Sequence, residues 1–439
     1  MGEVLIGLGG IILFMGLAWC FSTARGRINW RVIFWGLLLQ FAFAAVIFRL
    51  PAGYILFQWI NDAVVTFLSF AKEGMYFLFG PLAVSPGTTG PKGESSPGFI
   101  LAFQALPSVV FFSSLMSLLY YLKIMPLIVR GFAFVFRKLM RISGAESLCA
   151  ASNIFVGVES SLTIRPFLAR MTKSELCTIL TAGMGTIAST VLALYVSFLY
   201  SDFPAIAGHL VSASVLSAPA CIIMSKLIYP ESQIPRTLGK VPKLEGSSAK
   251  SWIEAIIYGA NDGIKLCVGI IALLLAFLGL LALANWLLAK FAFLFGLILD
   301  LHLELSLQKI LSWIFYPLTR MMGVSSESAL PVARILGERS IVTELVSYQH
   351  LSELIRTGSI QDIKSIVIAA YALCGFAHIA SLAIFVGGIS ALAPGRTGDL
   401  ARIGFRALLA ATLACLMTGS IAGIFFTGGQ PILGAIPPD

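Results

Sequence analysis

The chain has 439 residues, of which 58% are hydrophobic and only 12% are charged, whereas about 25% of the residues of an average soluble domain are charged. A water-soluble fold of this length would have to expose much of that apolar surface, so the composition excludes an ordinary soluble protein. The 30 basic residues outnumber the 21 acidic ones, yet they lie between apolar runs and form no patch interleaved with aromatic residues. We therefore expect no nucleic-acid partner.

The apolar residues fall in runs long enough for a helix to cross about 30 Å of hydrocarbon. Eight runs predict transmembrane helices at about residues 4–22, 30–48, 99–122, 175–199, 205–227, 264–289, 363–390 and 404–426. The first run has no basic segment before it and no cleavage site after it, which is typical of a retained helix. With both termini outside, 20 of the 30 basic residues fall on the cytoplasmic side, as the positive-inside rule expects. The sequence thus predicts an all-α, multi-pass protein of the inner (plasma) membrane.

Three stretches do not fit as simple spans. Residues 53–82 contain charged and aromatic residues together and read as one or two helices near the outer interface, followed by a Gly-, Pro- and Ser-rich loop at 83–98. Residues 142–170 and 309–344 are interrupted by Gly, Ser, Pro and charges. Both must return to the side on which they started, so we predict two re-entrant helical hairpins, which survive at membrane depth only when protein or a water-filled cavity covers them.

The two halves of the chain also resemble each other. The span after the first hairpin contains MGTIASTV (184–191), and the span after the second contains FAHIASLA (376–383). Paired broken segments of this kind mark the binding site of a transporter built as an inverted repeat. The expected units are an N-terminal part at 1–98, a first gate repeat at 99–250 and a second gate repeat at 251–439.

Several motifs identify a family. They are SNIFVG (152–157), IRPFLARMTKSEL (164–176), TELVSYQHL (343–351), YALCGFAHIAS (371–381) and LAPGRTGDLARIGFRALLAATLACL (392–416). With them the chain resembles the concentrative nucleoside transporter family over nearly its whole length. The resemblance implies that the protein is a transporter and not an enzyme. It further implies a homotrimer that imports nucleosides by an elevator motion driven by a sodium or proton gradient. It also implies a substrate site between two hairpins and two partly unwound helices.

Two glutamates are the candidate substrate ligands, Glu159 and Glu344. A carboxylate at membrane depth costs about 2.5–3.5 kcal/mol, and the ribose hydroxyls and base N–H groups of a nucleoside are donors that would offset this cost. The resemblance makes Glu344 the ribose-binding glutamate, with Phe376, His378 and Ser381 beside it. It places Glu159 on the base side, lined by Val158 and Val191. Alternatively, each glutamate only caps a half-helix or pairs with an arginine.

The chain departs from the family at three points. The first hairpin reads GVESS (157–161), which is one residue shorter than the family pattern and lacks its Gln and Pro, so Ser160 is an alternative contact in place of Glu159. His378 replaces the Asn of the family's GFAN motif, and Thr343 replaces the Asn before the second glutamate. A histidine adds a group that titrates near pH 6.5 and so suggests altered specificity or proton coupling. The alternative is a neutral packing residue.

A sodium site is expected at the first hairpin. Sodium is bound by oxygens, which carbonyls freed by a helix break supply without added charge. By resemblance the ligands are Asn153, the Val156 carbonyl, Thr186 and the Ile187 carbonyl. Alternatively, Asn153 and Thr186 only bond helix carbonyls and a proton is the coupling ion. We expect no other cofactor, because the remaining histidines are isolated and the seven cysteines lie in apolar stretches without CxxC spacing.

The leading interpretation is a nucleoside symporter, with sodium favoured over protons as the coupling ion. A second interpretation is a symporter of the same fold for a modified nucleoside, a nucleobase or another small solute, because GVESS and His378 depart from the family. A third is a non-transporting membrane sensor or assembly protein. The expected partners are therefore a nucleoside, the lipid bilayer and two further copies of the chain.

Overall fold

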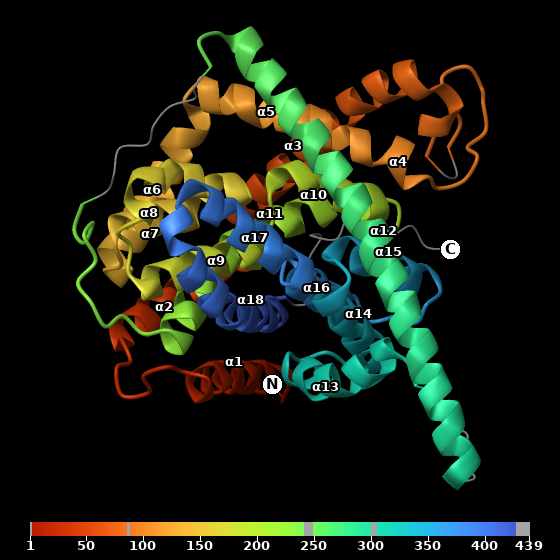
Figure 1. Ribbon diagram of the computed structural model, residues 1–439. Helices are drawn as coiled ribbons and strands as arrows, with labels where there is room; N and C mark the ends of the chain where they lie inside the picture. The colour runs from red at the N-terminus through yellow and green to blue at the C-terminus, as the bar shows by residue number, and fades with distance from the viewer. Residues whose placement is uncertain (1, 86–87, 241–248, 300–304, 427–439) are drawn as a thin grey trace.

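Helices make up all of the regular structure (Figure 1). The computed structural model describes residues 2–85, 88–240, 249–299 and 305–426. Within these ranges the only other pairing is two isolated β-bridges, so the predicted all-α class is confirmed. Seven of the described helices are long and apolar enough to cross a membrane, and three shorter apolar helices accompany them. Met1 and residues 427–439 are not among the described residues, and the outer position of both termini stays a prediction.

The N-terminal part contains α1 (Gly2–Cys20), α2 (Trp30–Arg49) and α3 (Pro51–Phe79). The first two follow the predicted spans closely. The third is one continuous helix of 29 residues, and it is long enough to cross a membrane. Proline at its first position suits a helix start, and the charged residues in its last third are Lys72 and Glu73, both good helix formers. After the short 3-10 helix η1 (Gly80–Ala83), the described residues up to 100 form turns, as predicted for a loop.

The first half of the remaining chain is organised around a helical hairpin and a broken helix. It begins with α4 (Leu101–Gln104), α5 (Leu106–Tyr121) and α6 (Ile124–Met140). Hairpin 1 follows, with arms α7 (Gly144–Ser152) and η2 (Val158–Ile164) plus α8 (Arg165–Leu168). The predicted span at 175–199 is two helices, α9 (Lys173–Gly185) and α10 (Ser189–Leu199), and α11 (Ile206–Ile228) ends this half.

The second half has the same order of elements. It comprises α12 (Trp252–Leu299), α13 (Leu307–Met321), hairpin 2 with arms α14 (Ala329–Ile341) and α15 (Glu344–Arg356), the broken pair α16 (Ile363–Leu373) and α17 (Ile379–Leu392), the 3-10 helix η3 (Pro394–Arg396) and α18 (Thr397–Phe425).

Hairpin 2 lies further along the chain than the predicted 309–344. The predicted stretch contains α13 and only the first arm of the hairpin. Gly323, with a φ of +92°, lies just after the end of α13 and separates it from that arm. The second arm escaped prediction because it is rich in polar residues and has no continuous apolar run.

The two helix breaks lie against each other in the buried core. Gly375, in the break between α16 and α17, has a φ of +135°, a conformation that L side chains rarely adopt. A Cβ there would lie 3.0 Å from the carbonyl oxygen of Met184 and 2.8 Å from the Cys415 sulfur. The C-terminal ends of the half-helices α9 and α16 therefore meet, and glycine is needed for their close approach.

Helix α12 is the longest element and the least buried of the long helices. It crosses the front of the molecule as a single rod, and its end near residue 299 extends beyond the other helices (Figure 1). It packs tightly on α5, because a Cβ at Gly263 would lie 2.7 Å from the Cα of Val110. By contrast, α11 and the broken helix α9–α10 are almost completely buried. All seven cysteines are free, and five of them are buried.

Candidate functional site

One cavity of about 510 Å³ lies between the two hairpins, the two broken helices and α12. This volume is within the range of about 300–1,000 Å³ that small-molecule sites usually have. Of the eight predicted substrate residues, the structure brings seven to its wall: Val158, Glu159, Val191, Glu344, Phe376, His378 and Ser381. Residues more than 200 positions apart in the chain thus share one pocket, because both hairpins and both helix breaks converge there.

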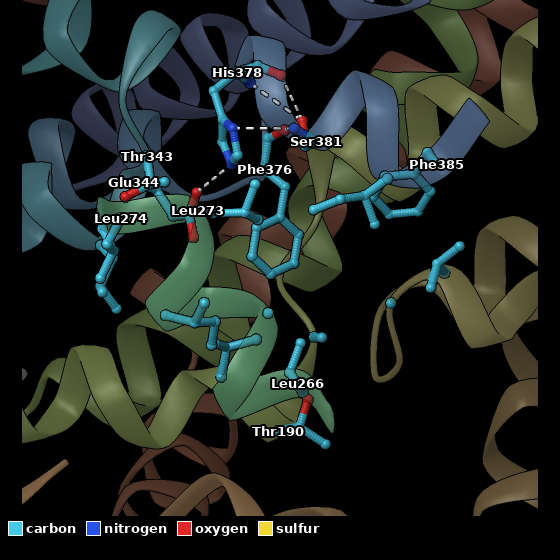
Figure 2. Close-up of a pocket in the computed structure, with 18 of the residues that line it drawn as sticks. Thr190, Leu266, Leu273, Leu274, Thr343, Glu344, Phe376, His378, Ser381 and Phe385 are labelled. Carbon is cyan, nitrogen blue, oxygen red and sulfur yellow. Dashed lines mark hydrogen bonds and ion pairs between the residues drawn. The ribbon is translucent and has the colours of Figure 1, made fainter. Parts of the chain in front are cut away.

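The second helix break sets the orientation of His378. This residue is the N-cap of α17, and its Nδ1 accepts a hydrogen bond from the backbone N–H of Ser381 at 3.1 Å. Since Nδ1 is an acceptor, the ring proton of a neutral His378 must be on Nε2. Nε2 lies 2.9 Å from Oε2 of Glu344, and Figure 2 shows the ring between Ser381 and this carboxylate. The break therefore directs one N–H group at the glutamate.

Glu344 is held from both sides although it is buried. It begins α15, directly after the non-helical Thr343, and only 4% of its surface is exposed. The hydroxyl of the fully buried Tyr195 donates to Oε1 at 2.8 Å, while His378 faces Oε2. A carboxylate accepts about four hydrogen bonds, so two acceptor positions remain for a ligand. The side-chain oxygen of Thr343, which also lines the cavity, has no hydrogen-bond partner among the described residues.

Glu159 occupies a more open position than predicted. Its side chain is exposed, although the sequence analysis expected a buried carboxylate. A Cβ at Gly157 would lie 3.3 Å from its Oε2, so the carboxylate is folded back over the tip of hairpin 1 at the cavity wall. The shortened GVESS segment forms a 3-10 helix instead of a full α-helical arm, which leaves Glu159 less enclosed than Glu344.

Ser160 does not line the cavity. Its hydroxyl donates to Oδ1 of Asn153 at 2.9 Å, and it lies 3.5 Å from the Cys149 sulfur inside hairpin 1. The structure thus turns Ser160 away from the pocket and gives no support to it as the alternative substrate contact.

The four residues expected to bind sodium also come together. The hydroxyl of Thr186 lies 2.7 Å from the backbone carbonyl oxygen of Asn153 and 2.8 Å from that of Ala182, and it can donate its one proton to either. The amide nitrogen of Asn153 donates to the Cys149 carbonyl at 3.1 Å, so both side chains bond helix carbonyls, as the alternative interpretation holds. Their oxygens still have free acceptor positions. Across the described residues, no donor makes a hydrogen bond to the carbonyl oxygens of Val156 and Ile187.

These oxygens suit a monovalent cation. The tip of hairpin 1 and the break between α9 and α10 supply two carbonyl oxygens, one amide oxygen and one hydroxyl, all neutral, and Asn153, Thr186 and Ile187 are buried. Neutral oxygens released by a helix break are the usual donors for Na⁺ in transporters. In the part of the chain that the structure describes, no group of three or more His, Cys, Asp or Glu residues is arranged to hold a metal ion.

Comparison with known proteins identifies the family. Residues 9–82 and 209–423 match the N-terminal and C-terminal regions of the Na⁺-dependent nucleoside transporter family, and residues 102–201 match the "Gate: Nucleoside recognition" family. The chain is 37% identical over 425 residues to the uncharacterized transporter YutK of Bacillus subtilis (strain 168), covering 96% of this chain and 100% of YutK. The chain belongs to the concentrative nucleoside transporter family. This is a family of transporters, not of enzymes.

Other relatives agree with this membership. The chain is 41% identical to solute carrier family 28 member 3 of Mus musculus, covering 96% of this chain but 59% of that protein. It therefore spans about three fifths of the length of this mammalian member of the family. Among solved structures, CNTnw in an inward-facing substrate-bound state is 33% identical and superposes with a TM-score of 0.85, covering 96% of this chain and 98% of that chain.

The sequence analysis missed two parts of this concentrative nucleoside transporter site. One is the wall formed by α12, where Leu266, Ile270 and Leu273 face the cavity. Its uninterrupted apolar run reads as lipid-facing, and no motif marks it. The other is Tyr195, a buried phenol in an apolar span, whose role becomes visible only when α10 packs against the start of α15.

Proposed function

We propose that the protein imports nucleosides by cation symport, with Na⁺ as the favoured coupling ion and H⁺ as the alternative. The observation that carries this proposal is the buried Glu344 carboxylate at the cavity wall, which Tyr195 and His378 orient and which keeps two unused acceptor positions. The two neighbouring hydroxyls of a ribose are donors of matching number. Charge-assisted hydrogen bonds of this kind are stronger than neutral ones.

The rest of the cavity suits the base. Apart from its polar residues, the wall consists of apolar side chains from α12, together with Phe376 and Phe385. Apolar and aromatic walls bind a planar ring by burial and stacking. At the tip of hairpin 1, Val158 and the accessible carboxylate of Glu159 supply an apolar contact and an acceptor for base N–H groups. A ligand with a hydroxyl-rich end and a planar end therefore matches the site better than a nucleobase alone.

Cation coupling follows from the position of the sodium ligands. Asn153 and Val156 lie at the tip of hairpin 1, only a few residues before Val158 and Glu159, and Thr186 and Ile187 lie just before Val191. The backbone N–H and the hydroxyl of Ser189 both donate to the Phe155 carbonyl, at 2.9 Å and 2.5 Å, which ties the two segments together. A cation bound to both segments would fix the substrate-facing residues that follow them, so that occupied cation and substrate sites stabilise each other.

The wider arrangement completes the proposal. Hairpins 1 and 2 enter the bilayer from opposite faces in an inverted repeat, and both termini lie outside the inner membrane. The units 1–98, 99–250 and 251–439 form the N-terminal part and the two gate repeats, and transport proceeds by an elevator motion within a homotrimer. The similar order of the main elements in the two halves supports the repeat, and the likeness to an inward-facing CNTnw structure supports transport by a moving site.

Uptake into liposomes tests the function. Purified protein is reconstituted, and [³H]uridine accumulation is measured with an inward Na⁺ gradient and with choline, each at two pH values. Accumulation that requires Na⁺ supports sodium symport, and accumulation in choline that follows an imposed proton gradient supports proton symport. A competition panel of nucleosides, modified nucleosides and nucleobases then defines the substrate. Absence of accumulation and of competition by every nucleoside would refute the proposal and favour another solute.

A further inference from the structure

Arg339 is a fully buried arginine that has no acidic partner among the described residues. It lies in the last turn of α14, the first arm of hairpin 2, and none of its surface is exposed. Its Nη1 donates to the carbonyl of Ala372 at 2.5 Å, close to the C-terminal end of α16. Its Nε and Nη2 atoms make no hydrogen bond to an oxygen or nitrogen atom of the described residues. A buried charge of this kind is costly unless something nearby is negative.

The side chains around this guanidinium group are neutral. The thiols of Cys374 and Cys415 and the phenol of Tyr348 are the titratable groups on which its charge acts. The neighbouring acid on the same helix, Glu338, is turned away and lies 2.6 Å from Nδ1 of His350. No ion pair to Arg339 is present within the described ranges. The compensating negative potential must therefore come from the backbone.

Two helix ends supply that potential. Helix α16 ends at Leu373 and α9 at Gly185, and the two breaks are in contact at Gly375. The Cys415 thiol joins them, since it donates to the carbonyl of Cys374 at 2.9 Å and lies 3.8 Å from that of Gly185. The C-terminus of a helix carries roughly half a negative charge. Two such ends that meet in a buried core repel each other unless a cation lies beside them.

The positive charge beside the helix ends comes from a different source in each half of the chain. In the first half, the oxygens of the proposed sodium site lie where the tip of hairpin 1 meets the break between α9 and α10. In the second half, the corresponding place is where the end of α14 meets the break between α16 and α17, and there the guanidinium group of Arg339 bonds the α16 end. Apart from the short helices α4 and η3, both halves have two helices, a hairpin, a broken helix pair and a final helix in the same order, so the two positions correspond.

We infer that Arg339 is a built-in cation, whose fixed positive charge takes the place in the second half that sodium takes in the first. Its charge stabilises the end of α16, and this end fixes the break that carries Phe376 and His378 into the cavity. Arg339 is thus a positioning residue for the substrate site, which it does not touch. The inference rests on the proposed sodium site for its comparison of the halves, but its main test needs neither sodium nor a nucleoside.

The test compares Arg339→Lys with Arg339→Met. Both side chains are unbranched and of similar length, but only lysine is charged. We expect the lysine variant to keep a melting temperature near that of the parent, and the methionine variant to melt well below it. If the arginine served only packing, the result would be reversed, because replacing a buried charge by a well-packed apolar side chain is often neutral or stabilising. Arg334→Met, on the exposed face of the same helix, is the matched control and should change nothing.

Chemical rescue provides an independent measurement. Arg339→Ala leaves a space for a small planar ion, so millimolar guanidinium should raise the melting temperature of this variant while urea, a neutral molecule of the same shape, should not. Equal effects of urea and guanidinium, or a methionine variant as stable as the lysine variant, would overturn the inference. Failure of both the lysine and the methionine variants to fold would also overturn it, because charge alone would then not suffice.

Nucleoside binding is the second readout. The lysine variant should bind with nearly the parental Kd, whereas the methionine variant should lose affinity at any Na⁺ concentration, because Phe376 and His378 are displaced. If the parent protein binds no nucleoside, the proposed function fails, but the melting temperatures still decide the role of Arg339. If the parent binds nucleosides and the lysine and methionine variants behave alike, the inference fails and the proposed function stands.

Discussion

Replacing Glu344 by glutamine removes the charge of the site with little change in shape. In the protein, Oε1 accepts from Tyr195 at 2.8 Å and Oε2 faces Nε2 of His378 at 2.9 Å. A glutamine can satisfy both neighbours, with its oxygen toward His378 and its NH₂ group toward the Tyr195 oxygen, which can rotate its proton away. We therefore expect the melting temperature of Glu344→Gln to stay close to that of the parent.

Substrate affinity should fall instead. The two free acceptor positions of the carboxylate leave room for two ligand hydroxyls, and a hydrogen bond to a charged group contributes about 1.5–3 kcal/mol against about 0.5–1.5 kcal/mol for a neutral one. Losing the charge thus removes roughly 1–1.5 kcal/mol for each of the two bonds. The sum, about 2–3 kcal/mol, corresponds to a roughly 30- to 150-fold increase in Kd. Titration calorimetry with a nucleoside, or uptake at rising substrate concentration, measures this change.

Glu338→Gln is the matched control. Glu338 is also buried in hairpin 2 and also contacts a histidine, with 2.6 Å between its Oε2 and Nδ1 of His350. It does not line the cavity, so its replacement should affect stability and leave Kd unchanged. An unchanged Kd in Glu344→Gln, or an equal loss of affinity in both variants, would refute the assignment of Glu344 to the substrate.

Three further outcomes follow from the same geometry. Thr186→Val removes one candidate sodium ligand and should raise the Na⁺ concentration for half-maximal uptake by about tenfold, equivalent to ~1.4 kcal/mol. The nucleoside Kd at saturating Na⁺ should stay unchanged, and an unaltered Na⁺ dependence of uptake would contradict the proposed sodium site. His378→Asn keeps an N-cap for α17 but its shorter side chain loses the 2.9 Å contact to Glu344, so the nucleoside Kd should rise, and an unchanged Kd would exclude a role for His378 in orienting the carboxylate. Gly375→Ala forces a Cβ to within 2.8 Å of the Cys415 sulfur at a φ of +135° and should lower the free energy of unfolding by at least about 2 kcal/mol. Thermal unfolding measures this change, and Gly387→Ala, whose Cβ would meet nothing within 4 Å, is the control.

Length and hydrophobicity predicted the spanning helices well, because burial in lipid constrains both strongly. The predicted spans lie along α1, α2, α5, α11, α12 and α18, and the helix breaks implied by the family resemblance are present at 186–188 and 374–378. Hairpin 2 was predicted too early in the chain, because a helix that packs between other protein segments needs no continuous apolar run. Its second arm, α15, is half polar, and its buried face is recognisable only from its neighbours.

In the candidate site, too, some residues could be predicted from their type and others only from their packing. Glu344 was singled out because a carboxylate in an apolar region is conspicuous, whereas Phe376, His378 and Ser381 were named from the family resemblance. Tyr195 and the α12 wall were missed, because a phenol or a leucine in a spanning helix has many roles and only the packing selects one. The accessible position of Glu159 depends on the 3-10 conformation of the shortened hairpin arm, which residue types alone do not specify.

The 48 residues of α12 make a rod about 70 Å long, more than twice the thickness of the hydrocarbon layer. Where it faces the cavity it offers almost only aliphatic surface, and the exception, Lys265, bonds Asp262 on the same helix at 3.2 Å. Every other polar side chain at the cavity belongs to the hairpins and broken helices. Among the described residues, the hairpins and broken helices make no hydrogen bond or ion pair to α12. In the elevator motion proposed above, these elements and a bound solute would therefore slide along the rod without the cost of breaking a polar contact to it.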